Sequence, residues 1–193
     1  MLIVKMNIIN EIKNFVEEEC KKPTSKYGYE PFTHHFNRVH SIALQLAKQL
    51  NANTEIVEIA AWLHDIGSII SGREDHHITG AQIAVNKLRE LNYPQDKIEQ
   101  VRLCILNHRG SKEDINLRDF IEAKILAEAD AISSFEFIEG LFRAAYTENL
   151  TQDEARKSVR EKLQRKWNQL ILPESRELIK PKYDAVMLLL GES

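Results

Sequence analysis

The sequence predicts an all-α fold, a helical bundle formed by a single domain. Apolar residues recur at helical spacing through nearly the whole chain. Only seven glycines and five prolines interrupt this pattern. The 193 residues are 43% hydrophobic and 28% charged, which suits one buried core rather than two full domains.

The helices of the first half are bounded by turn and capping residues. Thr54 is a suitable N-cap for the helix that begins there, and Asn92-Tyr93-Pro94 ends a later one. Residues 21–31 form a connector, and residues 68–75 are expected to form a polar loop. The helices expected in this half are residues 7–20, 32–50, 54–66, 77–91 and 95–107.

The second half contains longer helices and fewer turn signals. Residues 151–154 read Thr-Gln-Asp-Glu, a capping-box pattern that predicts the start of a helix. Pro173 ends that helix, and the segment after residue 147 is expected to be a helical appendage of the one domain. The expected elements are a loop over 108–116, one long helix or two over 118–133 and 134–146, and helices over 151–170 and 175–190.

Composition excludes several classes of partner. A formal net charge of −3 gives no electrostatic reason to expect nucleic acid as the main partner. Cys20 and Cys104 are too few for a disulfide framework, and no stretch approaches the roughly 20 apolar residues that span a bilayer. We therefore expect a cytoplasmic protein whose main partner is neither nucleic acid nor a membrane.

The histidines point to a site. All seven lie within the first 108 residues. His64 and Asp65 follow the apolar run of residues 56–63 and come just before Gly67. An imidazole and a carboxylate in a buried position are costly without a partner, and a divalent metal ion is a suitable one.

Two further residues complete a set of metal donors. His35 shares a helical face with Val39 and Leu46, whereas His34 lies on a polar face. Asp130 lies in an alanine-rich apolar stretch where a carboxylate needs a partner. A hydrogen-bonded core histidine is the alternative for His35. Two imidazoles and two carboxylates suit Mn, Mg, Fe, Co, Ni or Zn, and the lack of cysteine argues against a closed structural zinc site.

Three motifs carry a resemblance to a known family. His35-Phe-Asn-Arg38-Val39, His64-Asp65-Ile-Gly67 and Glu128-Ala-Asp130-Ala resemble, in this order, the motifs of the HD superfamily of metal-dependent phosphohydrolases. The resemblance covers about residues 32–135, and it implies a helical bundle of the HD-domain type. It also implies hydrolysis of a nucleotide or another phosphorylated metabolite by a metal-activated water. The implied metal ligands are His35, His64, Asp65 and Asp130.

The number of metal ions, one or two per chain, is left open. Members with two ions add two histidines between the HD pair and the last aspartate. Their His-x-x-x-Gly spacing points to His76, whereas His77 shares the apolar face of its helix with Ala81. His108 is the other candidate, either as a second-metal ligand or as a phosphate contact. A role at the loop or helix end without any ligand is the alternative for these histidines.

The resemblance also suggests roles in catalysis. Asp65 would be a ligand that also orients the water or accepts its proton. Positive charge for the phosphoryl group would come from Arg38, Arg109 or Lys124, and Arg73 is another candidate. Two other functions stay open: an oxygen-dependent enzyme with a di-iron site, and a non-catalytic domain that binds a nucleotide and regulates. A homodimer is left open as well: the helix that contains Trp167 would either pair with a second subunit or cover the site.

Overall fold

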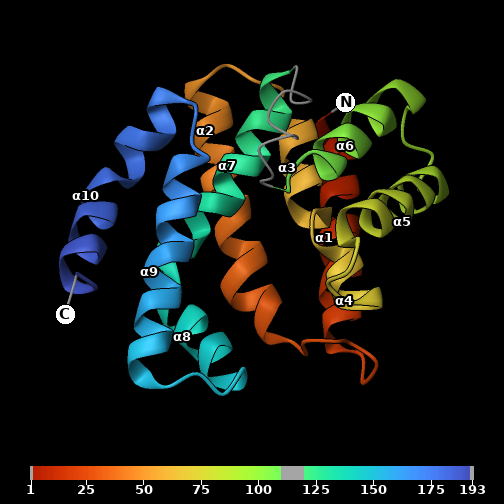
Figure 1. Cartoon of the computed structure of the whole chain (residues 1–193). Helices are drawn as coiled ribbons and strands as arrows, with labels where there is room; N and C mark the ends of the chain where they lie inside the picture. Colours follow the sequence, from red (N-terminus) through yellow and green to blue (C-terminus); the bar gives the residue numbers. More distant parts are fainter. Residues whose placement is uncertain (1, 110–119, 192–193) are drawn as a thin grey trace.

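The computed structural model describes residues 2–109 and 120–191, with side chains from residue 8 onward, and these residues contain no β-strand. The predicted all-α fold is therefore confirmed (Figure 1). The helices are α1 (Leu2–Lys21), the π-helix η1 (Phe32–Phe36), α2 (Asn37–Gln49), α3 (Thr54–Leu63), α4 (Ile66–Ser71), α5 (His76–Glu90), α6 (Gln95–Leu106), α7 (Ile121–Glu136), α8 (Ile138–Thr147), α9 (Gln152–Asn168) and α10 (Pro173–Leu189).

Helix α3 is the centre of the core. Its residues from Ile56 to Leu63 are apolar on every side except at Glu58, and a helix of this kind must be buried. Helices α1, α2, α6 and α7 pack around it. The chain that leaves its C-terminal end, at His64 and Asp65, therefore emerges inside the protein and not on its surface.

The C-terminal helices pack against the part of the chain that carries the motifs. Helix α9 contacts both α7 and α8, and α10 contacts α7 and α9 (Figure 1). The buried carboxylate of Glu128 on α7 accepts hydrogen bonds from the backbone N–H groups of Ile171 (2.7 Å) and Leu172 (3.0 Å). These bonds satisfy backbone donors just before α10 begins, so they fix the α9–α10 connection to α7.

The segment expected as one helix over residues 32–50 begins with a π-helical turn. The backbone N–H of Asn37 donates to the carbonyl of Phe32, five residues earlier, and the Asn37 side chain donates to the same oxygen at 2.9 Å. Such turns are frequent at functional sites because they re-aim the side chains that they contain. Here the turn contains His35.

The helix expected over residues 54–66 ends earlier, and part of the expected loop is helical. Helix α3 stops at Leu63, and α4 begins at Ile66 and continues to Ser71, so a loop starting at residue 68 was wrong. Gly67 makes α4 possible here. A Cβ on Gly67 would lie 2.2 Å from the carbonyl oxygen of His76 and 2.7 Å from the backbone nitrogen of Gly80, so only glycine allows α4 to lie this close to α5.

Helix ends show where local signals were sufficient. The N-cap of α3 is Asn53 and not Thr54, because the Asn53 side chain accepts from two backbone N–H groups of the first turn. The predicted capping box at Thr151 is confirmed: its hydroxyl accepts from the N–H of Glu154, whose carboxylate accepts from the N–H of Thr151.

The segment expected to form either one long helix or two forms two, α7 and α8, with the break at Phe137. The loop expected over 108–116 lies mostly outside the described residues.

Among the residues that the structure describes, no helix is both long enough and apolar enough to cross a bilayer.

Candidate metal centre

His35, His64 and Asp130 come together from three separate helical elements. The Nε2 atom of His35 lies 3.0 Å from the Nε2 of His64 and 3.5 Å from Oδ1 of Asp130. One donor atom from each of the three lies within 4.8 Å of the other two. His35 comes from η1, His64 from the end of α3 and Asp130 from α7, so the fold unites donors that are 95 residues apart in the sequence.

A second group of donors lies beside the first. Nε2 of His76 and Nε2 of His108 lie 3.3 Å and 3.5 Å from Oδ1 of Asp65. The three donor atoms of this group are again within 4.8 Å of one another. His76 is the first residue of α5, and His108 follows α6. The site thus contains two neighbouring triads rather than one.

Asp65 lies between the two groups with one oxygen toward each. Its Oδ2 is 3.3 Å from Nε2 of His35 and 3.7 Å from Nε2 of His64, while Oδ1 faces His76 and His108. A carboxylate in this position is suited to bridge two cations. The donors are nitrogen and oxygen only, a set that fits divalent transition metals.

The histidine tautomers also suit metal binding. Nδ1 of His64 lies 2.8 Å from the carbonyl of Ala61, Nδ1 of His108 lies 2.6 Å from that of Ile105, and Nδ1 of His76 lies 2.9 Å from that of Arg73. A carbonyl only accepts, so in each ring Nδ1 carries a proton, and the neutral form of the ring has its lone pair on Nε2. All three lone pairs are then available in the centre, as in metal sites whose ligands are oriented by backbone carbonyls.

Burial and close charged neighbours act in opposite directions on the ionisable groups of the centre. Burial opposes ionisation of Asp65, but His64, His108 and His35 outweigh it and hold its pKa well below the usual value. Burial also disfavours the imidazolium of His64 and lowers its pKa to about 4. For His35 burial acts in the same direction, yet the hydrogen bond to Asp65 and the charge of Asp130 raise its pKa above the usual 6.5. The carboxylate of Asp65 is thus ionised, and the raised pKa of His35 favours a proton on this ring beside Asp65 and Asp130.

This proton predicts a pH dependence of metal binding. A metal ion must displace the proton from His35 before Nε2 can act as a ligand. Below the raised pKa of His35, metal affinity should therefore fall by about tenfold per pH unit. Asp65 stays ionised and His64 stays neutral in this range, so they add no slope. Metal titrations at pH 6, 7 and 8, repeated in buffers of different ionisation enthalpy, would measure the affinity and the protons released. An affinity that is constant over this range would contradict the assignment.

The structure distinguishes the two adjacent histidines at the start of α5. His76 reaches the centre, whereas Nδ1 of His77 is buried without a hydrogen-bond partner among the described residues. The left-handed backbone of Asp75 (φ 47°) turns the chain just before α5 and sets this direction. His76, the histidine with the His-x-x-x-Gly spacing, is thus the one that faces Asp65. Metal ligation by His76 stays a prediction.

The expected phosphate-binding cations are not all near the centre. Arg38 donates to the carbonyl of His34 at 2.7 Å, and its guanidinium lies 5.1 Å from the ring centre of Phe137, against which His34 also stacks. Lys124 precedes Asp130 by six residues, which places it about 120° away around α7. Arg109 lies close enough to His77 to contribute, after burial, to the lowering of that residue's pKa. Phosphate contact by any of these three stays a prediction.

One cation at the centre was missed. The ammonium of Lys166, on α9, lies 2.9 Å from Oδ2 of Asp130. Lys162 and Lys166 are spaced four residues apart, so a basic face of α9 is visible in the sequence. Nothing in the sequence indicates that this face turns toward Asp130 rather than toward solvent.

Comparison with known families agrees with this fold. The sequence pattern of the family described as HD domain matches residues 32–134, which is more than half of the chain. The chain belongs to the HD domain family. The match begins with the π-helical turn that carries His35 and ends just after Ser133, so it contains all six donors.

Two relatives cover part of the chain. Over 112 residues it is 33% identical to a ribonuclease Y of Symbiobacterium thermophilum, which corresponds to 57% of this chain and 19% of that protein. Over 103 residues it is 32% identical to an uncharacterized protein of Clostridium beijerinckii, 51% of this chain and 62% of the other. The chain therefore matches less than two thirds of the length of either relative.

Solved structures share the fold over nearly the whole length. Bacillus subtilis YpgQ, determined in complex with ADP, aligns with a TM-score of 0.75 at 19% identity, covering 96% of this chain and 92% of that one. An HD-superfamily hydrolase from Bacillus thuringiensis aligns with a TM-score of 0.73, also at 19% identity, over 96% and 94%. These alignments extend through the C-terminal helices, which lie beyond the family match.

Proposed function

We propose that this chain is a metal-dependent phosphohydrolase that acts on a nucleotide or another small phosphorylated metabolite and uses two divalent ions. The observation that carries the proposal is the pair of donor triads on either side of Asp65, His35–His64–Asp130 and Asp65–His76–His108. The hydrolases among the structural relatives and the ADP in the B. subtilis protein support the choice of a phosphorylated substrate.

The residues of the chain have distinct tasks in this mechanism. The six donors would hold the metal ions, which when bound would supply a Lewis acid for a phosphoryl oxygen and an activated water. Asp65 fixes the relative position of the two groups of donors and offers carboxylate oxygens to orient the attacking water or to accept its proton. The ammonium of Lys166 lies beside Asp130 and supplies positive charge for the phosphoryl group in the transition state.

The proposal predicts that activity depends on metal. Protein treated with chelator and then freed of it should hydrolyse no phosphorylated compound, and addition of Mn, Co or Ni should restore hydrolysis. A suitable panel contains p-nitrophenyl phosphate, nucleoside mono-, di- and triphosphates, a dinucleotide and a short RNA. The RNA tests whether the chain shares the activity named for the ribonuclease Y relative.

Two results would contradict the proposal. One is hydrolysis that persists unchanged in chelator. The other is a protein that binds two iron ions, absorbs visible light and consumes dioxygen without releasing phosphate, which would favour the di-iron alternative.

A further inference from the structure

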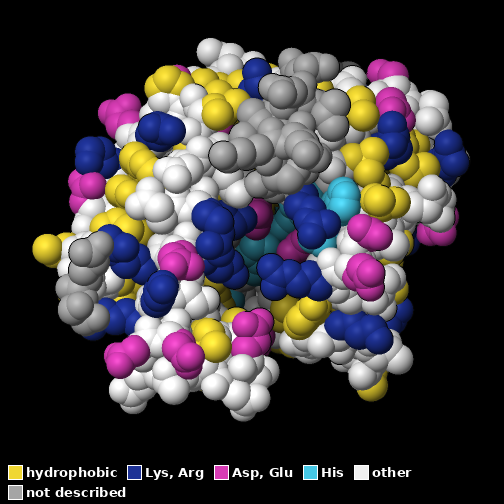
Figure 2. Space-filling view, viewed as in Figure 1, with side chains coloured by type: hydrophobic (Ala, Val, Ile, Leu, Met, Phe, Trp, Pro, Cys, Tyr) yellow, Lys and Arg dark blue, Asp and Glu magenta, His cyan; other side chains and the backbone are white. Residues whose placement is uncertain are grey.

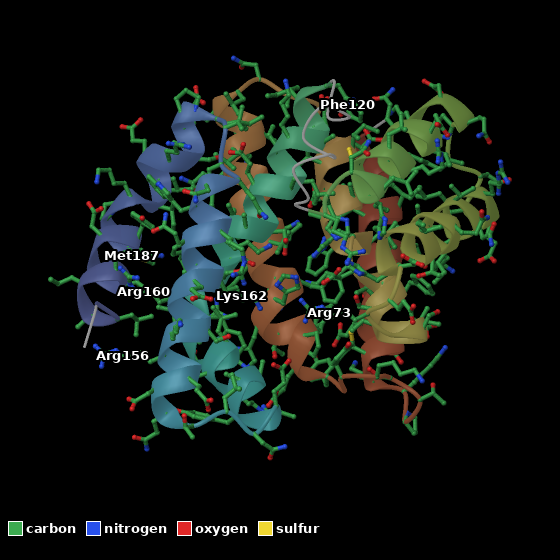
Figure 3. The ribbon with its side chains drawn as sticks, in the orientation of Figure 1. Arg73, Phe120, Arg156, Arg160, Lys162 and Met187 are labelled. Carbon is green, nitrogen blue, oxygen red and sulfur yellow. The ribbon has the colours of Figure 1, made fainter. Side chains whose placement is uncertain are left out.

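A basic cavity adjoins the metal centre on the side of α9. Its volume is about 550 Å³, and its lining includes four cations, Arg73, Lys162, Arg165 and Lys166, and one carboxylate, Glu148. Figure 2 shows a hollow with Lys and Arg side chains on both sides and His and acidic side chains at its base. In Figure 3, Lys162 extends from α9 and Arg73 from the opposite side, where α4 and α5 meet.

The cavity shares one residue with the candidate metal centre. Lys166 lines the cavity and also contacts Asp130 at 2.9 Å. Lys162 lies four residues before Lys166, a rise of about 6 Å along α9. A ligand with one charged group at the metal centre can therefore extend past Lys166 to Lys162.

These cations have few compensating charges. Within residues 8–109 and 120–191, no carboxylate forms an ion pair with Arg73, Lys162 or Arg165. Burial, followed by repulsion from Arg73 and Lys166, lowers the pKa of Lys162. Lys162 and Lys166 are partly buried, whereas Arg73 and Arg165 are exposed, and repulsion between partly buried cations is a cost to the fold. An anionic ligand would remove that cost, and phosphate groups match lysine and arginine donors well.

We propose that Arg73, Lys162 and Arg165 form a subsite for the further phosphate groups of a substrate that carries two or more phosphates in a chain. The proposal deepens the function proposed above, on which it rests: one phosphate lies at the metal ions and its neighbours extend along α9. The subsite makes the chain selective for di- and triphosphates over simple monoesters. None of its three residues belongs to the metal-binding motifs.

Binding of inorganic tripolyphosphate tests the subsite without requiring activity. Calorimetry on the metal-free 193-residue chain would compare tripolyphosphate with orthophosphate. We expect Lys162→Gln and Arg165→Gln each to weaken tripolyphosphate binding by about tenfold and to change orthophosphate binding much less. Arg73→Gln, on a different element, should act in the same direction. Lys157→Gln is the matched control, because Lys157 is an exposed lysine of α9 that does not line the cavity.

The outcomes separate this proposal from the proposed function. Unchanged tripolyphosphate affinity in Lys162→Gln and Arg165→Gln, or an equal loss in Lys157→Gln, would overturn the subsite whether or not the protein is a hydrolase. Selective loss in a protein that hydrolyses nothing with any metal would support the subsite and reject the phosphohydrolase. If the protein is active, Lys162→Gln should lower kcat/KM for a nucleoside triphosphate about tenfold more than for p-nitrophenyl phosphate.

Discussion

Replacing Asp65 with asparagine is expected to remove both metal ions and to lower phosphohydrolase activity at least about a thousandfold. The substitution keeps the shape of the side chain and removes its charge. Because Oδ1 faces His76 and His108 while Oδ2 faces His35, one change affects both triads. No other residue among the described donors contributes to both groups.

Single changes in the two groups provide the comparison. His76→Ala should lose one ion and retain the other, since the triad of His35, His64 and Asp130 is intact. His34→Ala should retain both ions, because His34 stacks on Phe137 and lies outside both triads. Metal content per chain by plasma mass spectrometry and initial rates with added Mn would measure these effects. An Asp65→Asn protein with two ions per chain and the unchanged rate would disprove the bridging role.

The central part of the fold was predictable because the local sequence pattern and the packing of the whole chain require the same structure there. The run from Ile56 to Leu63 is apolar on nearly every face, so it must be the core helix, and His64 and Asp65 must follow it into the interior. Asp130 was predictable for a similar reason, since a lone carboxylate in an apolar helix requires a partner. These are polar residues in apolar stretches of sequence, and such residues can be recognised without a structure.

The parts that were missed depend on contacts between distant segments. Helix α4 exists because Gly67 lets the chain approach Gly80 on α5, and neither glycine alone predicts this contact. The π-helical turn at His35 has hydrogen bonds between residues five apart instead of four, a difference that the apolar spacing does not resolve. Lys166 belongs to a basic helix face, and most such faces are exposed to solvent. Only the packing of α9 on α7 brings Lys166 to Asp130.

Gly67→Ala is expected to damage the second group of donors more than the first. The new methyl group would lie 2.2 Å from the carbonyl oxygen of His76 and 2.7 Å from the backbone nitrogen of Gly80. Both are backbone atoms, so α4 and α5 must separate. Alanine is the better helix former by about 0.5–1 kcal/mol, but the overpacking should cost about 1–3 kcal/mol and leave a net loss of stability.

The same separation should reach the metal centre. It moves the first residue of α5, His76, away from Asp65, and a displacement near 1 Å can lower activity about a hundredfold. We therefore expect Gly67→Ala to unfold at lower urea concentration and to bind one ion tightly instead of two.

Gly80→Ala is the graded control for this prediction. Its methyl group would approach the backbone nitrogen of Gly67 only to 3.3 Å, so a shift of a few tenths of an ångström relieves the contact. Its stability and metal content should fall between those of the unchanged protein and Gly67→Ala. If Gly67→Ala instead matches the unchanged protein in both measurements, the close approach of α4 and α5 does not position His76. The second group of donors would then need another explanation.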